Sequence, residues 1–527
     1  MAERYQGPLI IDFRGGLRTD MIPQVHFEKW QQDPWFSRCE NRLFEQSGAA
    51  RKVGGSTRIN STAITDSPNI MGMYDFWLTG AAGSFTQKFM AVTSDSKIYK
   101  EDMDGTFDEI TGAASITANA VPVFETFADL AIMFFSTNDT PLKWTQSGNV
   151  ASLAGSPPAG RGCVVHANRL WVWGTNANPS RLSYSAYGDP ETWTGSDSGT
   201  LTINDDDGDR IICCESHKDT LVIWKGPNKG SIHLLEGRSP PDWAIPPTLI
   251  TGNPMQGPNG AIAVGDDIWF LTRNGIYSLS ATQKFGNFAQ ADLTRYHKGL
   301  FRDTINLNQL ARSWGQHYLH KSCAVWTLTQ NGITDPDLAL CISYARLAEE
   351  GYLISTWPRR SCFSAAIRNN PTTRLDELVF GTTNGFCERQ DTATRTLANN
   401  SAYNFIMETP QLIIAPIEAG DQPVTLERAY LKSRPVGDWD TVVHIQRDAN
   451  AYENYTFNQG TSGFLLGTSI LGIGVLGGGT AQTTVSDLAG TASSIKATFQ
   501  QNGIGEDADW HEFGIDWTKS ARTSEAR

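Results

Sequence analysis

The sequence predicts an all-β protein: an irregular β-propeller of about seven blades, with six to eight as the range, followed by an antiparallel β-sandwich or platform domain. Three observations lead to this fold class. A unit of strand, tight turn and strand recurs between about residues 71 and 390. The 49 Gly, 24 Pro and 16 Trp residues suit many short strands joined by tight turns. After about residue 402, alternating strands continue without that repeat.

The clearest copy of the repeated unit is Asp266–Leu279, in which two apolar, aromatic strands flank Arg273-Asn274-Gly275. An Asn-Gly pair between such strands predicts a hairpin, because a type I′ turn needs positive φ at both central residues. Successive copies lie roughly 40 to 50 residues apart, the interval expected for four-stranded propeller blades. The other copies are Lys88–Lys100, Ala131–Trp144, Asn168–Tyr184, Asp219–Leu234, Ser322–Ile354 and Glu377–Glu388.

The pattern divides the chain into three parts. Residues 1–62 predict an extended segment that packs on the platform, residues 63–401 the propeller, and residues 402–527 the platform domain. Spacing near 3.6 residues predicts one short helix between blades, at Asn287–Phe301. The platform strands are expected at Gln411–Ile417, Val424–Arg434, Asp440–Arg447, Ser493–Gln500 and Trp510–Thr518.

The charge balance argues against tight nucleic-acid binding. The net charge is −13, and no cluster of Lys and Arg forms a stripe that could bind phosphates. An acidic surface is nevertheless compatible with nucleic acid passing nearby, because like charges prevent it from sticking. The first residues lack a basic region followed by an apolar one, so no cleaved signal peptide is expected. The eight cysteines, none in a C-x-x-C pair, are expected to be buried reduced thiols.

The apolar segment Gly463–Gly479 is too short and too rich in glycine to span a bilayer, which needs about 20 apolar residues. It is expected to pack on protein, with a membrane-active segment as the alternative. Its Gly472–Gly477 stretch spells G-x-G-x-x-G, but no strand and helix flank it as a dinucleotide site requires. We expect a subunit contact here, made by Phe464, Leu465, Leu466, Ile470 and Leu471.

No catalytic, cofactor or metal site is predicted. The densest carboxylate cluster, Asn204–Asp209, does not fit a calcium loop, because Ile203 and Cys214 would occupy ligand positions. The stretch Gly195–Leu201 only partly resembles the Asp-box of propeller glycosidases. His317 and His320 would point to opposite faces of a strand, so they imply no shared metal.

An ordered set of short motifs resembles tail proteins of short-tailed bacteriophages. The motifs are Asp207-Gly208-Asp209-Arg210-Ile211, then Leu221–Lys225, Ser231–Leu234 and Asp266–Leu279, preceded by Gly188-Asp189-Pro190 and Trp193. The family patterns are D-G-D-x-I, L-x-x-F/W-K, S-I/V-x-x-L and F-L-x-x-x-G-I-Y-x-L, in that order. The likeness covers about residues 168–279 and extends to the rest through architecture alone. Ser47–Gly54 also resembles the family's G-x-x-x-x-R-x-G start, although Val53 replaces the usual Pro.

The resemblance implies a tail nozzle, or tail tubular, protein: an irregular β-propeller beside a platform domain, with no enzymatic activity. Six copies would form a ring below the portal and adaptor proteins, through which DNA leaves the virion without tight binding and to which tail fibres or spikes attach. The protein would be made in the host cytoplasm, without stable insertion into a membrane. The acidic loop of Asp205, Asp206, Asp207 and Asp209 is then expected to face the channel or the ring interface.

Two other kinds of protein fit the same fold. A propeller could recognise a glycan or receptor on a host surface with aromatic loops, which exposed, clustered Trp residues would favour. It could also be a propeller glycosidase or lyase, which would need carboxylates that converge in the central cavity.

Overall fold

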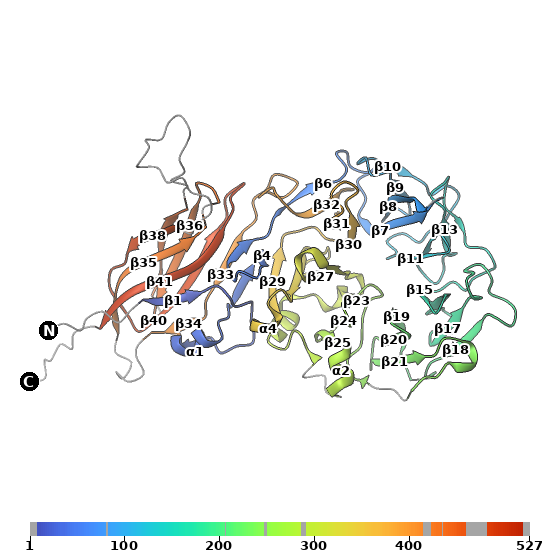
Figure 1. Cartoon of the computed structure of the whole chain (residues 1–527), viewed down its shortest axis with the longest axis horizontal. Coiled ribbons are helices and arrows are strands. Elements are labelled where there is room, and N and C mark those ends of the chain that lie inside the picture. Colours follow the sequence, from blue (N-terminus) through green and yellow to red (C-terminus); the bar gives the residue numbers. More distant parts are fainter. Residues whose placement is uncertain are drawn as a thin grey trace, which may run out of the picture. The chain divides into compact units, whose positions relative to one another are not determined.

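The computed structural model describes residues 8–80, 83–205, 207–246, 250–285, 291–414, 423–434, 436–448, 450–459 and 482–519, and the chain divides into two compact units (Figure 1). The propeller unit comprises residues 57–340 and 359–390, and the platform unit comprises residues 1–56, 341–358 and 391–527. Both units are built mainly of strands, which confirms the predicted fold class. Residues 341–358, predicted as propeller, belong to the platform unit, because β29 (Leu353–Pro358) pairs there with β3 (Arg38–Glu40).

Six small antiparallel sheets form separate blades of the propeller. The first three are β7 (Ile70–Thr79), β8 (Phe85–Thr93), β9 (Ile98–Glu101) and β10 (Phe107–Glu109); β11 (Val123–Phe127), β12 (Leu130–Phe134), β13 (Leu142–Trp144) and β14 (Ala151–Ser152); and β15 (Gly162–His166), β16 (Arg169–Trp173), β17 (Arg181–Tyr184) and β18 (Gly199–Thr202). The others are β19 (Arg210–His217), β20 (Thr220–Gly226), β21 (Ser231–Glu236) and β22 (Ile250–Thr251); β23 (Ala261–Val264), β24 (Asp267–Thr272) and β25 (Gly275–Ser278); and β30 (Ser364–Asn369), β31 (Asp376–Gly381) and β32 (Cys387–Thr392), with β6 (Gly55–Arg58) at the outer edge.

A seventh position in the ring is filled by β26 (Gly315–Tyr318). This strand contacts both β23 and β30, and it pairs with β27 (Cys323–Leu328), which β28 (Leu338–Ser343) follows in the sheet. Figure 1 shows the labelled strands of the propeller unit following one another around its centre. Six separate blades and this seventh position lie within the range expected from the sequence.

Each hairpin recognised in the sequence supplies the second and third strands of a ring position. The strands carry large aromatic residues because these fill the space between successive blades. Trp224 and Phe270 meet between two neighbouring blades with ring centroids 5.6 Å apart, and Phe76 meets Trp144 in the same way at 6.0 Å. Trp269 and Tyr277 are also buried, so the hairpin aromatics pack the blades as expected.

The hairpin at Asn274-Gly275 forms, but its turn is not type I′. Thr272 pairs directly with Gly275, so the two loop residues are Arg273 and Asn274, and neither has positive φ. Only Gly275 does, at 138°, and a Cβ there would lie 2.2 Å from the Thr294 hydroxyl. The glycine is therefore needed for its backbone angle and for close packing, one position later than a type I′ turn would use it.

Helices in the described part of the chain are few and short. They are α1 (Phe27–Gln32), α2 (Leu279–Phe285) and α4 (Leu347–Glu350), three 3-10 turns η2 (Pro240–Asp242), η4 (Leu307–Arg312) and η5 (Leu319–Lys321), and one π turn η3 (Leu300–Thr304). The helix predicted at Asn287–Phe301 is wrong as a single element. Its residues 287–290 lie outside the described part, 293–296 form turns, and the regular helix is α2, directly after the hairpin. Among the described helices, none is long and apolar enough to cross a membrane.

The platform unit is a β-sandwich. One sheet contains β1 (Leu9–Asp12), β4 (Arg42–Phe44), β5 (Ala50–Lys52), β35 (Val424–Ser433), β38 (Gln482–Asp487), β39 (Thr491–Ala492) and β41 (Asp509–Lys519). Facing it are β2 (Gln24–His26), β3, β29, β33 (Phe405–Glu408), β34 (Gln411–Ile413), β36 (Asp440–Arg447), β37 (Tyr452–Asn458) and β40 (Ser494–Gln501). Both sheets contribute to one core, in which Phe513 of β41 packs edge-on against Phe499 of β40.

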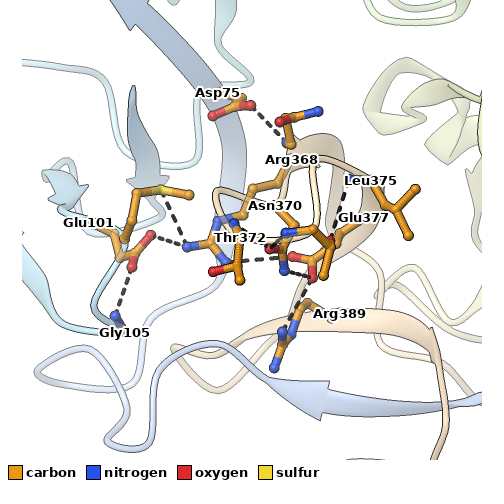
Figure 2. A network of polar contacts seen from close by, with 12 residues as sticks. Asp75, Glu101, Gly105, Arg368, Asn370, Thr372, Leu375, Glu377 and Arg389 are labelled. Atoms are coloured by element: carbon orange, nitrogen blue, oxygen red, sulfur yellow. Dashed lines mark hydrogen bonds and ion pairs between the residues drawn. The ribbon is translucent and has the colours of Figure 1, made fainter. Parts of the chain in front are cut away.

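A buried ion pair joins the last blade of the propeller to the first. Arg368 of β30 donates to Glu101 of β9 over 2.8 Å, and the two side chains are 7% and 0% exposed (Figure 2). Around this pair, Glu101 accepts from the amide of Gly105, and Asp75 of β7 accepts from the amide of Asn369. We call Asp75, Glu101, Arg368 and Asn369 the closing seam, because they tie the two ends of the ring together.

Candidate functional site: the central cavity of the propeller

The innermost strands of the propeller surround a cavity of about 410 Å³. Residues of all seven, β7, β11, β15, β19, β23, β26 and β30, contribute to its wall. A propeller builds such a cavity because its blades taper towards the axis without meeting there. The cavity is therefore the place where residues far apart in the sequence converge.

Two glutamates of this wall, Glu125 and Glu215, are close enough for their charges to interact. Burial raises the pKa of Glu125 on β11 to about 8, and the negative charge of Glu215 adds to the shift, while the amides of Val165 and Thr126 oppose it. Burial raises the pKa of Glu215 on β19 to about 7. Because two interacting carboxyls titrate as a pair, the pair keeps a proton near neutral pH.

A third carboxyl, Asp75, lines the same cavity but belongs to the closing seam as well. Burial raises its pKa, whereas hydrogen bonds from Asn369, Gln87 and Trp77 oppose the shift. His317 of β26 is also in the wall, and burial lowers its pKa, so its ring is neutral at neutral pH. Among the described residues that line the cavity, none is a lysine or an arginine.

Aromatic rings form another part of the wall. Tyr74 and Phe124 stack with their centroids 5.1 Å apart and their planes 6° from parallel, and the Tyr74 hydroxyl bonds to Thr126 at 2.7 Å. Trp173 and Trp314 also line the cavity. The cavity therefore combines carboxyls with π faces, a combination suited to sugars or to organic cations.

No sequence motif marks this site. Glu125, Glu215 and Asp75 lie on three strands, and only closure of the ring brings them to one cavity. The available signal was a lone acidic residue within an apolar strand, as in Val123–Phe127 and in Cys213-Cys214-Glu215. These residues place carboxyls in the central cavity, where a propeller hydrolase would need them.

The predicted acidic loop is held within its own blade. Lys225 of β20, which is fully buried, donates to Asp207 over 2.6 Å and to the carbonyls of Ile203 and Asn204. The buried carboxylate of Asp209 accepts three backbone amides in the turn between β20 and β21, from Asn228, Lys229 and Gly230, at 2.7 to 2.9 Å. The first and second motifs of the phage-tail resemblance, D-G-D and the final lysine of L-x-x-F/W-K, are therefore bonded to each other.

Asp205 is exposed, and Asp206 lies outside the described residues. The predicted subunit contact of Phe464, Leu465, Leu466, Ile470 and Leu471 also lies outside them. Whether the acidic loop faces a channel or a ring interface stays a prediction.

The described residues hold no group of three or more His, Cys, Asp or Glu side chains arranged to bind a metal ion. His317 lies on β26 and His320 in the η5 turn that follows it. All eight cysteines are buried as free thiols in the structure. Burial raises the pKa of Cys39 to about 11, and it raises the pKa of Cys163, Cys213 and Cys214 well above the ordinary thiol value.

No protein-family model and no curated protein matches the chain. Among solved structures, the chain is similar to YCF48 bound to a D1 peptide, with 11% identity, 63% of this chain and 94% of that chain covered, and a TM-score of 0.37. It is also similar to the computationally designed Ika8 protein (9% identity, 63% and 99% covered, TM-score 0.34). A third is an exo-β-1,3-galactanase from Phanerochaete chrysosporium with galactose (10% identity, 88% and 100% covered, TM-score 0.28). Likenesses this distant carry no argument about activity or ligands.

Proposed function

We propose that this chain is a structural, non-enzymatic subunit of a short bacteriophage tail, and that about six copies form a ring-shaped nozzle below the portal and adaptor. The observation that carries the proposal is the ordered motif set of residues 168–279. In the structure, two of these motifs meet in the bond between Asp207 and Lys225, so their joint presence has a physical reason. A propeller and a β-sandwich platform in one chain also match the architecture that the resemblance implies.

The proposed role in DNA ejection is passive. The cavity of one propeller, about 410 Å³, cannot admit a DNA duplex, whose major groove alone is about 12 Å wide. DNA would therefore travel along the axis of the ring, between copies of the chain. With a net charge of −13 per subunit, a ring would repel the phosphate backbone and let it slide.

The partners in this proposal are other copies of the chain, the portal and adaptor, and tail fibres or spikes. The purified chain of 57.8 kDa is expected to form particles of about six copies, alone or when mixed with its portal and adaptor proteins. Mass photometry of both samples tests this. A chain that stays monomeric and does not bind the portal–adaptor complex would contradict the proposal.

A propeller glycosidase is the second candidate, favoured by the carboxyls in the central cavity. Glycosidases use one protonated and one ionised carboxyl, whose surroundings push their pKa values apart. Here burial raises the pKa of both Glu125 and Glu215, to about 8 and about 7, so near neutral pH the pair could supply one protonated and one ionised carboxyl. Hydrolysis of a glycoside that is lost in Glu215→Gln and retained in Glu236→Gln, an exposed glutamate of β21, would favour this candidate over the structural one.

A further inference from the structure

The central cavity contains negative charge that the protein itself does not balance. Elsewhere in the propeller, carboxylates are matched in one of two ways. Glu101 has Arg368, Asp207 has Lys225 and Asp292 has Lys298 as a cationic partner, whereas the buried Asp209 accepts three backbone amides. Within the described part of the chain, neither Glu125 nor Glu215 forms an ion pair, and no lysine or arginine lines the cavity. Leaving charges partly buried and unpaired costs stability, so such groups in a cavity are candidates for a functional site.

The amide side chains of the wall independently indicate a ligand that donates hydrogen bonds. Asn259 donates its NH₂ group to the carbonyl of Pro122 at 3.1 Å, and Gln316 donates its NH₂ group to the carbonyl of Ala365 at 3.0 Å. Each amide thereby keeps its side-chain oxygen as an acceptor. Together with the carboxyls, these oxygens give the wall an excess of acceptors, which a ligand rich in N–H donors would satisfy.

We propose that the central cavity binds a small organic cation, an alkylammonium or guanidinium group, between Glu125 and Glu215. The stacked rings of Tyr74 and Phe124 supply a π face for the apolar part of such a ligand or for the cation itself. A metal ion fits less well, because no three potential ligands are gathered for it within the described residues. This inference is independent of the proposed nozzle, since it concerns the interior of one propeller.

Binding of a cation should displace the proton that the glutamate pair holds. The other titratable groups of the wall are Tyr74, Asp75, Cys163, Cys214 and His317. Of these, Asp75 is already hydrogen-bonded in the closing seam, and His317 is neutral. Affinity for a cation is therefore expected to rise with pH as Glu125 and Glu215 ionise.

The test is isothermal titration calorimetry of the full chain with butane-1,4-diamine and with methylguanidine, and butane-1,4-diol as the neutral control. We expect at least one cation to bind about tenfold more tightly at pH 8.5 than at pH 6, with proton release seen as a dependence of the heat on the buffer. Glu215→Gln should weaken binding about tenfold or more and the double variant with Glu125→Gln should abolish it. Glu236→Gln should bind as the wild type does.

Four results would overturn the inference: no binding of either cation at pH 8.5, equal binding of the diol, unchanged cation binding in the double variant, or tighter binding of Ca²⁺ or Mg²⁺ than of the organic cations. Circular dichroism melts of each variant establish that it is folded. The pH dependence of the wild type tests the inference even without the variants. A chain that forms rings but binds no cation would leave the proposed function intact and remove this inference alone.

Discussion

The closing seam and the central cavity place acidic side chains in the same propeller with opposite consequences. In the seam, Glu101 is buried beside Arg368 and accepts an amide as well, so its charge is matched. In the cavity, Glu125 and Glu215 are half-buried, the charge of Glu215 raises the pKa of Glu125, and neither has a cationic partner among the described residues. The comparison indicates that the seam stabilises the ring, whereas the cavity keeps unbalanced charge that a ligand can use.

The largest expected effect is on the seam. Arg368→Met should lower the free energy of unfolding of the propeller by about 3 to 5 kcal/mol, because it leaves the charge of Glu101 buried and unpaired. The matched control is Arg389→Met: its arginine contacts Glu377 at 3.3 Å but is 35% exposed, so about 1 kcal/mol or less is expected. Urea denaturation measures both. Equal losses for the two variants would show that burial of the pair does not set its importance.

A smaller loss is expected at the acidic loop. Asp209→Ala removes the acceptor of three backbone amides and should cost about 2 kcal/mol, since hydrogen bonds to a charged group are worth more than neutral ones. Asp205→Ala, at an exposed position of the same loop, should change stability by about 0.5 kcal/mol or less. Thermal denaturation compares the two. If Asp205→Ala cost as much as Asp209→Ala, the loop would not be anchored through Asp209.

Removing a carboxyl from the central cavity should raise stability, whereas the substitutions in the closing seam and the acidic loop lower it. Glu125 has a pKa of about 8 in the folded chain against 4.5 as its ordinary value, so the folded state holds the extra proton between these values. Stability is therefore expected to fall as pH rises from about 4.5 to about 8. Glu125→Gln should reduce this dependence, leaving the part that Glu215 contributes, and raise stability at pH 8 by on the order of 2 kcal/mol.

The matched control for the cavity is Glu236→Gln, which should keep the pH dependence of the wild type. Urea denaturation at pH 5, 6.5 and 8 resolves the two variants. A loss of stability in Glu125→Gln at pH 8 would mean that the Glu125 carboxylate is paired in solution, and the contrast with the seam would disappear.

The smallest effect is expected at the cysteines, which are buried groups without charge. Burial raises the pKa of Cys39 to about 11, and the same cause raises the pKa of Cys163, Cys213 and Cys214. Since the thiolate is the reactive form, a thiol reagent at pH 8 should label the native chain scarcely at all and all eight cysteines after unfolding. Rapid labelling of one thiol in the native chain would identify a sheet that opens.

The sequence predicted the middle strands of the blades and missed the strands that matter for the site. Hairpins such as Lys88–Lys100 and Glu377–Glu388 are visible because apolar strands flank a turn, and both form as expected. The innermost strands β11 and β26 have cavity-facing polar residues such as Glu125 and Gln316, which interrupt the apolar pattern. Their role depends on closure of the ring, which no local pattern encodes.

In the platform, too, the strands could be predicted from local alternation, whereas features that depend on tertiary contacts could not. Asp440–Arg447 and Val424–Arg434 were predicted from alternation, and the structure has them as β36 and β35, the latter ending at Ser433. The turn at Gly275 was placed correctly but given the wrong type, because the packing of Thr294 against Gly275 is a tertiary contact. The acidic loop was predicted as a surface for a channel or interface, and the bonds of Asp207 and Asp209 add a role within the blade.

The most direct test of the proposed nozzle is a cryo-EM reconstruction of the phage tail in which we propose that this chain lies. We expect about six copies in a ring below the adaptor, with Asp205 and other acidic residues along the bore and DNA passing between the copies. Absence of the chain from the tail, or a ring whose bore is lined by lysine and arginine, would contradict the account.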